Sequence, residues 1–133
     1  FMGNVYPARD LLEIAKSLLR GEMAYRAGDA ANAVFAFEAA VAIQDALPYT
    51  EPPFWYYPTR QSLGAALLKA GQLEEAEAVY RRDLADHPHN GWALFGLIQT
   101  LDAQGRTEAA DEARKHFKNV WQFADVTLSS SII

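Results

Sequence analysis

The sequence predicts an all-α fold, and three observations support this prediction. Alanine, the residue with the highest helix propensity, accounts for 24 of the 133 residues. No segment shows the sustained alternation of β-branched and polar residues that is typical of a half-buried strand. Gly28, Gly71 and Gly105 each stand where one amphipathic run stops and a second begins. Glycine is expected there, because the position after a helix often requires a left-handed backbone.

Helices are expected, in order, over residues 8–27, 29–46, 58–70, 73–86, 91–104 and 107–124. Pro7 and Pro58 suit the first turns of the first and third helices, because a missing N–H does no harm at that position. Pro88 closes the segment between the fourth and fifth helices, and Asn90 is the expected N-cap of the fifth.

The C-terminal tail, residues 125–133, lacks helical character. Two arrangements are open for it: a strip packed across the last helix, or a free end. Its apolar residues Leu128, Ile132 and Ile133 favour packing or insertion into a neighbouring molecule, because an exposed apolar end promotes aggregation.

The turn glycines recur at a regular spacing. The last two are 34 residues apart and the first two are 43 residues apart, because the longer interval holds an insertion of nine residues. Nine residues after the glycine the first two units have Phe37 and Tyr80, whereas the third has Arg114. Five residues after each glycine stands an alanine that permits close crossing of helices: Ala33, Ala76 and Ala110.

A helix-turn-helix unit of 34 residues resembles the tetratricopeptide repeat. The second unit fits that pattern best, at Leu63, Gly64, Leu67, Gly71, Ala76, Tyr80 and Pro88. The resemblance covers about residues 12–120 and implies a single domain, 1–133, that forms a right-handed α-α superhelix of three helical hairpins. It places the repeats at about 14–47, 57–90 and 91–124, the insertion at 47–57 and a short non-helical tail at 125–133. On this resemblance the chain is the C-terminal repeat segment of a longer bacterial-type protein.

Members of the family generally bind peptide segments or partner proteins on the concave surface that the first helix of each pair lines. The resemblance places these residues on that surface: Tyr25, Arg26, Gln61, Lys69, Trp92, Phe95, Gln99 and Asp102. Trp92 and Phe95 lie three residues apart, so one helical face offers two rings followed by hydrogen-bonding groups. An alternative for these rings, contact with the preceding helix pair or with the tail, stays open.

The insertion contains four consecutive aromatic residues, 54–57, after a proline-rich stretch. A loop with this polyproline bias has to bury its rings somewhere. Phe54 and Trp55 are expected to fill the gap that the longer turn opens between the first two helix pairs. Tyr56 and Tyr57 suit both packing and a ligand-binding surface, because their hydroxyl groups can serve a ligand.

Composition excludes several other classes of function. A formal charge of −5 and a pI near 5.1 have the wrong sign for general binding to phosphate backbones, so no nucleic-acid partner is expected. The absence of cysteine excludes disulfides, thiolate metal sites and a cysteine nucleophile. No apolar run approaches the ~20 residues that span a bilayer. A soluble protein without membrane insertion is therefore expected, with the cytoplasm favoured over the periplasm.

No enzyme motif is recognisable, since the chain lacks a nucleophile elbow, HExxH, a phosphate-binding loop and GxGxxG. Neither catalysis nor a cofactor is expected. His87 and His89 flank Pro88 without a third ligand nearby, which favours a polar turn over a metal site. The expected function is an interaction or scaffold module that binds a protein or peptide segment in its groove. The alternative is an architectural domain that forms homo-oligomers through the aromatic loop or the apolar tail.

Overall fold

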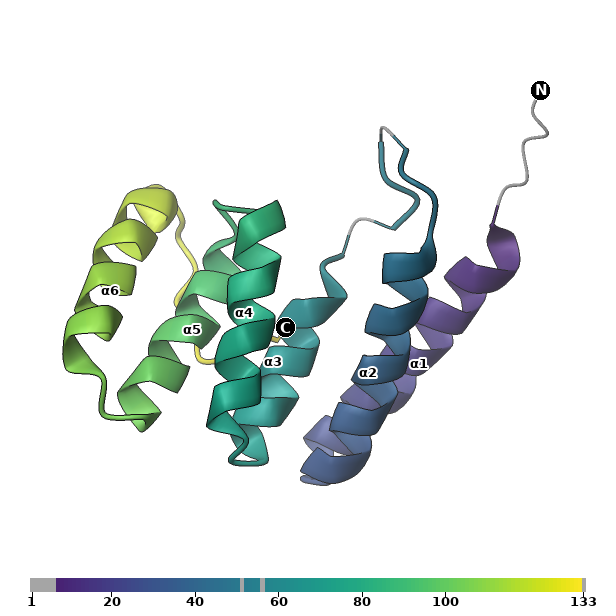
Figure 1. Ribbon diagram of the computed structural model, residues 1–133, viewed down its shortest axis with the longest axis horizontal. Helices are drawn as coiled ribbons and strands as arrows, with labels where there is room; N and C mark the ends of the chain where they lie inside the picture. Colours follow the sequence, from purple (N-terminus) through teal and green to yellow (C-terminus); the bar gives the residue numbers. More distant parts are fainter. Residues whose placement is uncertain (1–6, 51, 56, 133) are drawn as a thin grey trace. The chain divides into compact units, whose positions relative to one another are not determined.

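The computed structural model describes residues 7–50, 52–55 and 57–132, and these residues form six helices and no strand. The helices are α1 (Ala8–Arg26), α2 (Ala30–Ala46), α3 (Thr59–Lys69), α4 (Leu73–Asp86), α5 (Gly91–Ala103) and α6 (Thr107–Trp121) (Figure 1). The all-α prediction is confirmed, and each predicted helix is present. α6 ends at Trp121, three residues before the predicted end. The chain forms two compact units, Phe1–Thr59 and Arg60–Ile133.

Each helical hairpin turns on a glycine. Gly28, Gly71 and Gly105 have φ angles of +82°, +79° and +74°, so all three adopt the predicted left-handed conformation. The residue after each glycine donates its N–H to the carbonyl group five residues earlier, at 2.9, 2.9 and 3.0 Å in chain order. This bond is the one that closes a Schellman-type helix end. The three hairpins therefore share one local backbone signature.

In the first unit, α1 and α2 pack against each other. Ile14 of α1 and Ala33 and Phe37 of α2 are almost completely buried there. The two helices approach closely at Gly21, where an added Cβ would lie 2.4 Å from the ring of Phe37. The carboxylate of Asp29 caps the start of α2. This hairpin is thus specified by a small residue opposite a ring and by a polar N-cap.

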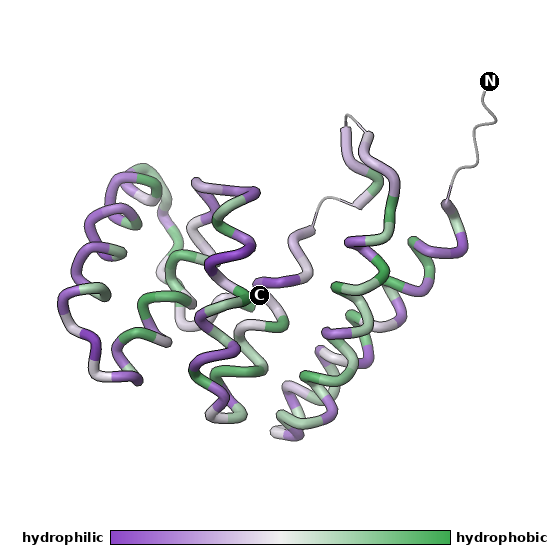
Figure 2. Tube along the Cα trace, viewed as in Figure 1, coloured by the Kyte–Doolittle hydropathy of each residue, from purple (hydrophilic) through white to green (hydrophobic). Residues whose placement is uncertain are grey.

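In the second unit, α5 is buried along most of its length, whereas α4 and α6 each keep a polar side (Figure 2). The difference follows from the sequence, because α5 is apolar on most of its circumference and α6 carries apolar residues on one side. The apolar core of this unit includes Leu63, Leu67, Tyr80, Leu94, Leu97 and Leu101. Among the described residues, none of the helices has the length and apolar character needed to cross a bilayer.

Candidate functional site

A slot between α3 and α5 receives the side chain of Tyr80, which comes from α4. The ring of Tyr80 is completely buried. A Cβ added to Gly64 of α3 would lie 2.4 Å from ring atoms of Tyr80, and one added to Gly96 of α5 would lie 2.2 Å from them. Both helices therefore need glycine to admit the ring. We call these three residues, Gly64, Tyr80 and Gly96, the tyrosine slot.

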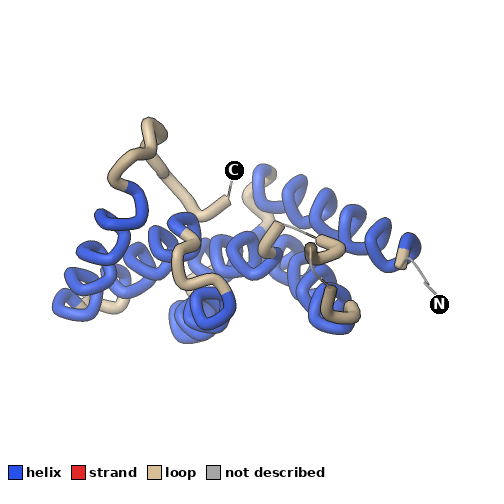
Figure 3. The backbone as a smooth tube through the Cα atoms, turned by 90° about the horizontal axis from the view of Figure 1, so that it is seen from above, coloured by secondary structure: helices blue, strands red, loops and turns tan. Residues whose placement is uncertain are grey.

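The C-terminal tail returns from the end of α6 across α5 toward α3, within the second unit (Figures 1 and 3). Two hydrogen bonds hold its first part. Trp121 donates its Nε1–H to the carbonyl oxygen of Val126 at 2.8 Å. Gln99 of α5 donates from Nε2 to the carbonyl oxygen of Ser129 at 3.2 Å. Both bonds go to main-chain carbonyl groups of the tail.

Ser131 is the tail residue that contacts Tyr80 of the tyrosine slot, and it is completely buried. Its hydroxyl group donates to the carbonyl oxygen of Gln61 at 2.9 Å. The same hydroxyl is hydrogen-bonded to the phenol of Tyr80, which acts as donor because the single proton of Ser131 is already used. The tail thus packs, as its apolar residues favoured, but against α3 and α5 rather than across the last helix.

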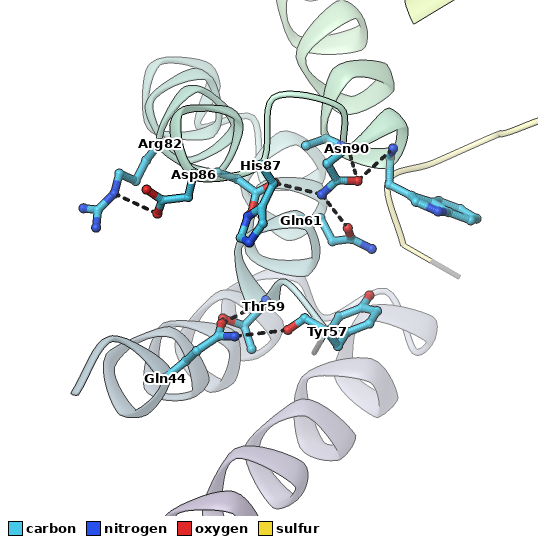
Figure 4. A network of polar contacts seen from close by, with 11 residues as sticks. Gln44, Tyr57, Thr59, Gln61, Arg82, Asp86, His87 and Asn90 are labelled. Carbon is cyan, nitrogen blue, oxygen red and sulfur yellow. Dashed lines mark hydrogen bonds and ion pairs between the residues drawn. The ribbon is translucent and has the colours of Figure 1, made fainter. Parts of the chain in front are cut away.

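Asn90 connects three helices of the second unit (Figure 4). Its Oδ1 accepts from the backbone N–H groups of Trp92 at 3.1 Å and Ala93 at 3.4 Å, which confirms the predicted N-cap. Its Nδ2 donates to Gln61 Oε1 at 3.0 Å and to Asp83 Oδ2 at 2.8 Å. The predicted groove residue Gln61 therefore uses its side chain inside this network. Its backbone carbonyl accepts a hydrogen bond from the tail.

Asp83 brings a buried carboxylate into the same network. Burial raises the pKa of Asp83 above its ordinary value of 3.8, although the hydrogen bond from Asn90 and the neighbouring His87 act in the opposite direction. The ring nitrogen Nδ1 of His87 lies 3.3 Å from Asp83 Oδ1. Between 3.8 and the raised pKa the folded chain binds more protons than the unfolded chain. The contribution of Asp83 to the free energy of unfolding therefore falls as the pH rises through this interval.

We expect Asp83→Asn to remove this pH dependence, because the amide keeps the shape of the carboxylate and does not ionise. The variant should gain stability relative to the wild type as the pH rises from 3.8 through the raised pKa. Urea unfolding at a series of pH values measures the difference. Asp86→Asn, which replaces an exposed carboxylate of the same helix, is the matched control. A variant whose stability relative to the wild type stays constant or falls as the pH rises would contradict the expectation.

Trp92 and Phe95, the two predicted groove rings, both pack against α6. Trp92 meets Trp121 edge-on with ring centroids 5.9 Å apart, and Phe95 lies 5.9 Å from Phe117. Phe117 and Trp121 stack at 5.6 Å and complete the cluster. Trp92 and Phe95 therefore contact the helix that follows them, α6. The two open interpretations were a place on the groove and contact with the preceding helix pair or the tail, and neither included this packing. Both rings remain half-buried, and their part in binding stays a prediction.

Asp102 and Lys69 are exposed predicted groove residues at the C-terminal ends of α5 and α3. Asp102 forms an ion pair with Arg114 of α6, whose Nη1 also lies 2.7 Å from Asp111. Both carboxylates raise the pKa of the Arg114 guanidinium, and Asp102 makes the larger contribution. Asp102 therefore has a structural partner in α6, and a binding role for Asp102 and Lys69 stays a prediction.

Tyr25 and Arg26 belong to the first unit, at the end of α1. Arg26 forms an ion pair with Glu22 at 2.8 Å. The half-buried Tyr57 accepts a hydrogen bond at its backbone carbonyl from Gln44 Nε2 at 3.3 Å (Figure 4). The remaining predicted tyrosine, Tyr56, lies outside the described residues. Phe54 and Trp55 are half-buried, and their expected packing role is likewise still a prediction.

Sequence reasoning missed the tyrosine slot and its contact with the tail. Tyr80 carried a signal, since it occupies the aromatic position of the repeat. Gly96 and Ser131 carried none, because Gly96 matches no position of the glycine phrases and Ser131 is one of three consecutive serines. Of the predicted residues, Gln61 and Gln99 hydrogen-bond to the tail, Gln61 through its main chain.

The comparison with protein families found a match to a model described as a tetratricopeptide repeat, over residues 67–113. This range begins in α3, ends in α6 and includes the turns at Gly71 and Gly105. A search of curated proteins and a search of solved structures found nothing that matches the chain. Repeats of this family are generally protein-interaction modules without catalytic activity. Residues 67–113 therefore match the tetratricopeptide repeat, the family that the spacing of the turn glycines predicted.

Proposed function

We propose that the protein is an interaction module that binds an extended segment of a partner protein on the face of α3 and α5. The observation that carries the proposal is the hydrogen bond from Gln99 Nε2 to the carbonyl oxygen of Ser129, at 3.2 Å. A side-chain amide that binds a main-chain carbonyl group recognises an extended peptide whatever side chain that residue carries. The general role of the family in protein interactions supports the same function.

The hydrogen-bonding pattern of this face gives the proposal a second support. Gln99 offers a donor, and the carbonyl oxygen of Gln61 accepts from a hydroxyl group. Donors and acceptors on neighbouring helices are what an extended peptide requires, because its main chain presents both kinds of group along its length. Trp92 and Phe95, half-buried on α5, add apolar surface to the same helix.

The test is selection of binders from a displayed library of random peptides on the immobilised protein. We expect Gln99→Glu to lose the selected peptides, because it replaces the amide donor by a carboxylate that repels carbonyl oxygens. Gln72→Glu introduces the same change at an exposed position before α4 and should keep them. A library that yields no binder, or binders that Gln99→Glu retains in full, would overturn the proposed function.

A further inference from the structure

The phenol of Tyr80 and the carbonyl oxygen of Gln61 together form a site that is specific for a small hydroxyl group. Ser131 donates to the carbonyl oxygen of Gln61 and accepts from the phenol of Tyr80. A serine or threonine hydroxyl can do both at once, whereas alanine and valine can do neither. A residue without a hydroxyl in this position would leave both buried polar groups without this bond, which is unfavourable for each group that stays unsatisfied.

The position of the slot explains how a residue of α4 takes part in binding at α3 and α5. The ring of Tyr80 passes between two glycines, one on each helix. The phenol oxygen lies so close to α5 that a Cβ on Gly96 would be 2.4 Å from it. The hydroxyl of Tyr80 thereby reaches Ser131 of the tail, while the rest of the side chain stays in the core.

Apolar residues stand on both sides of Ser131 in the tail. Leu128, three residues before it, and Ile132, the next residue, are both half-buried. Ser129 and Val126, in contrast, are exposed and contribute main-chain carbonyl oxygens to hydrogen bonds. The bound segment therefore combines one buried serine, two partly buried apolar side chains and main-chain contacts.

We propose that the face of α3 and α5 selects extended peptides that carry a serine with an apolar residue three positions before it and another directly after it. Residues 125–132 are the resident ligand, and a partner segment has to displace them. The inference rests on the proposed function. It adds the chemistry of the partner segment, and it identifies the tail as a competitor for the same face. A segment attached through a short linker competes at an effective concentration of about millimolar. The tail therefore weakens binding of any external segment that uses the slot.

The experiment uses the full chain and a fluorescein-labelled synthetic peptide with the sequence of residues 125–132, followed by fluorescence anisotropy. Ser131→Asp places a charge in a completely buried position and should release the tail. We expect this variant to bind the peptide at least about tenfold more tightly than the wild type does, because the binding-competent fraction rises. Thr127→Asp makes the same change at an exposed residue of the tail and should bind like the wild type.

A second peptide tests the slot itself. The peptide carrying Ser131→Val keeps the size of the side chain and loses the hydroxyl, so its affinity for the Ser131→Asp protein should fall about tenfold or more. Circular dichroism and a thermal melt verify that the Ser131→Asp protein is folded.

Ser131→Val in the full chain is a milder route to release of the tail. If Ser131→Asp unfolds the chain, this variant takes its place and should bind the unmodified peptide more tightly than the wild type does.

Several results would overturn the inference. These are equal binding of the serine peptide by Thr127→Asp and by both Ser131 variants, equal affinity for the serine and valine peptides, or a tail that enters a second copy, seen as a wild-type dimer in sedimentation velocity. If release of the tail does not strengthen the binding of peptides selected from the library, the proposed function stands and this inference is removed. A library without binders would remove the proposed function instead, even where the tail peptide binds.

Discussion

Replacing Tyr80 with alanine is expected to lower the free energy of unfolding by about 3–5 kcal/mol. The side chain is completely buried, and it fills the space between Gly64 and Gly96 on neighbouring helices. Neither glycine has a side chain that can move into the vacated volume, so the cavity stays open and adds its cost to the lost burial of the ring. The phenol also binds Ser131, so its removal takes away the donor that the tail uses.

Urea unfolding followed by far-ultraviolet circular dichroism measures this loss. Tyr80→Phe is the matched control, because it keeps the ring and removes only the hydroxyl. Its expected cost is about 1–3 kcal/mol, the range for a buried polar partner left unsatisfied. If Tyr80→Ala lowers the free energy of unfolding no more than Tyr80→Phe does, the ring contributes nothing through packing and the slot is not a structural element of the core.

The helices and their turns could be predicted because their determinants are local. Gly28, Gly71 and Gly105 fix the hairpin ends through a backbone conformation that few other residues adopt. Asn90 caps α5 through N–H groups two and three residues away. In each case the residue acts on its own neighbours in the sequence, so a pattern of a few residues is sufficient to predict the result.

The course of the tail could not be predicted in the same way. Its bonds to α3, α4 and α5 join residues that are far apart in the sequence, such as Ser131 with Tyr80 and with Gln61. Three consecutive serines offer three equivalent hydroxyl groups, and only the fold decides which one meets an acceptor. Leu128 and Ile132 indicated that the tail packs, but burial of apolar surface has no direction and does not identify the surface that receives it.

The third hairpin shows how two departures from the repeat pattern belong together. In the first two hairpins a ring, Phe37 or Tyr80, packs against a glycine of the preceding helix. The third hairpin has Arg114 where those rings stand, and Arg114 points to Asp102 and Asp111 instead. Without a ring to admit, the helix does not need a glycine, and Ile98 occupies that position and is buried. The departures are therefore one change in packing rather than two.

Gly96→Ala is expected to lower the free energy of unfolding by about 1–3 kcal/mol or more, the range for overpacking of a filled core. Glycine inside a helix is normally the less stable choice, by about 0.5–1 kcal/mol relative to alanine. Here the added Cβ would lie 2.2 Å from the ring of Tyr80. The ring has little room to retreat, because Gly64 of α3 is in equally close contact on its own side.

The sign of this effect should reverse when Tyr80 is already alanine. The clash is then absent, and Gly96→Ala should raise the free energy of unfolding by about 0.5–1 kcal/mol, the ordinary preference for alanine in a helix. A double-mutant cycle of the four proteins, each unfolded in urea, measures the coupling, which should be about 2 kcal/mol or more. Equal costs of Gly96→Ala in both backgrounds would mean that the backbone of α5, and not Tyr80, requires glycine. A reversal would assign the requirement to the ring, since removal of a single side chain on α4 would then have changed which residue α5 prefers.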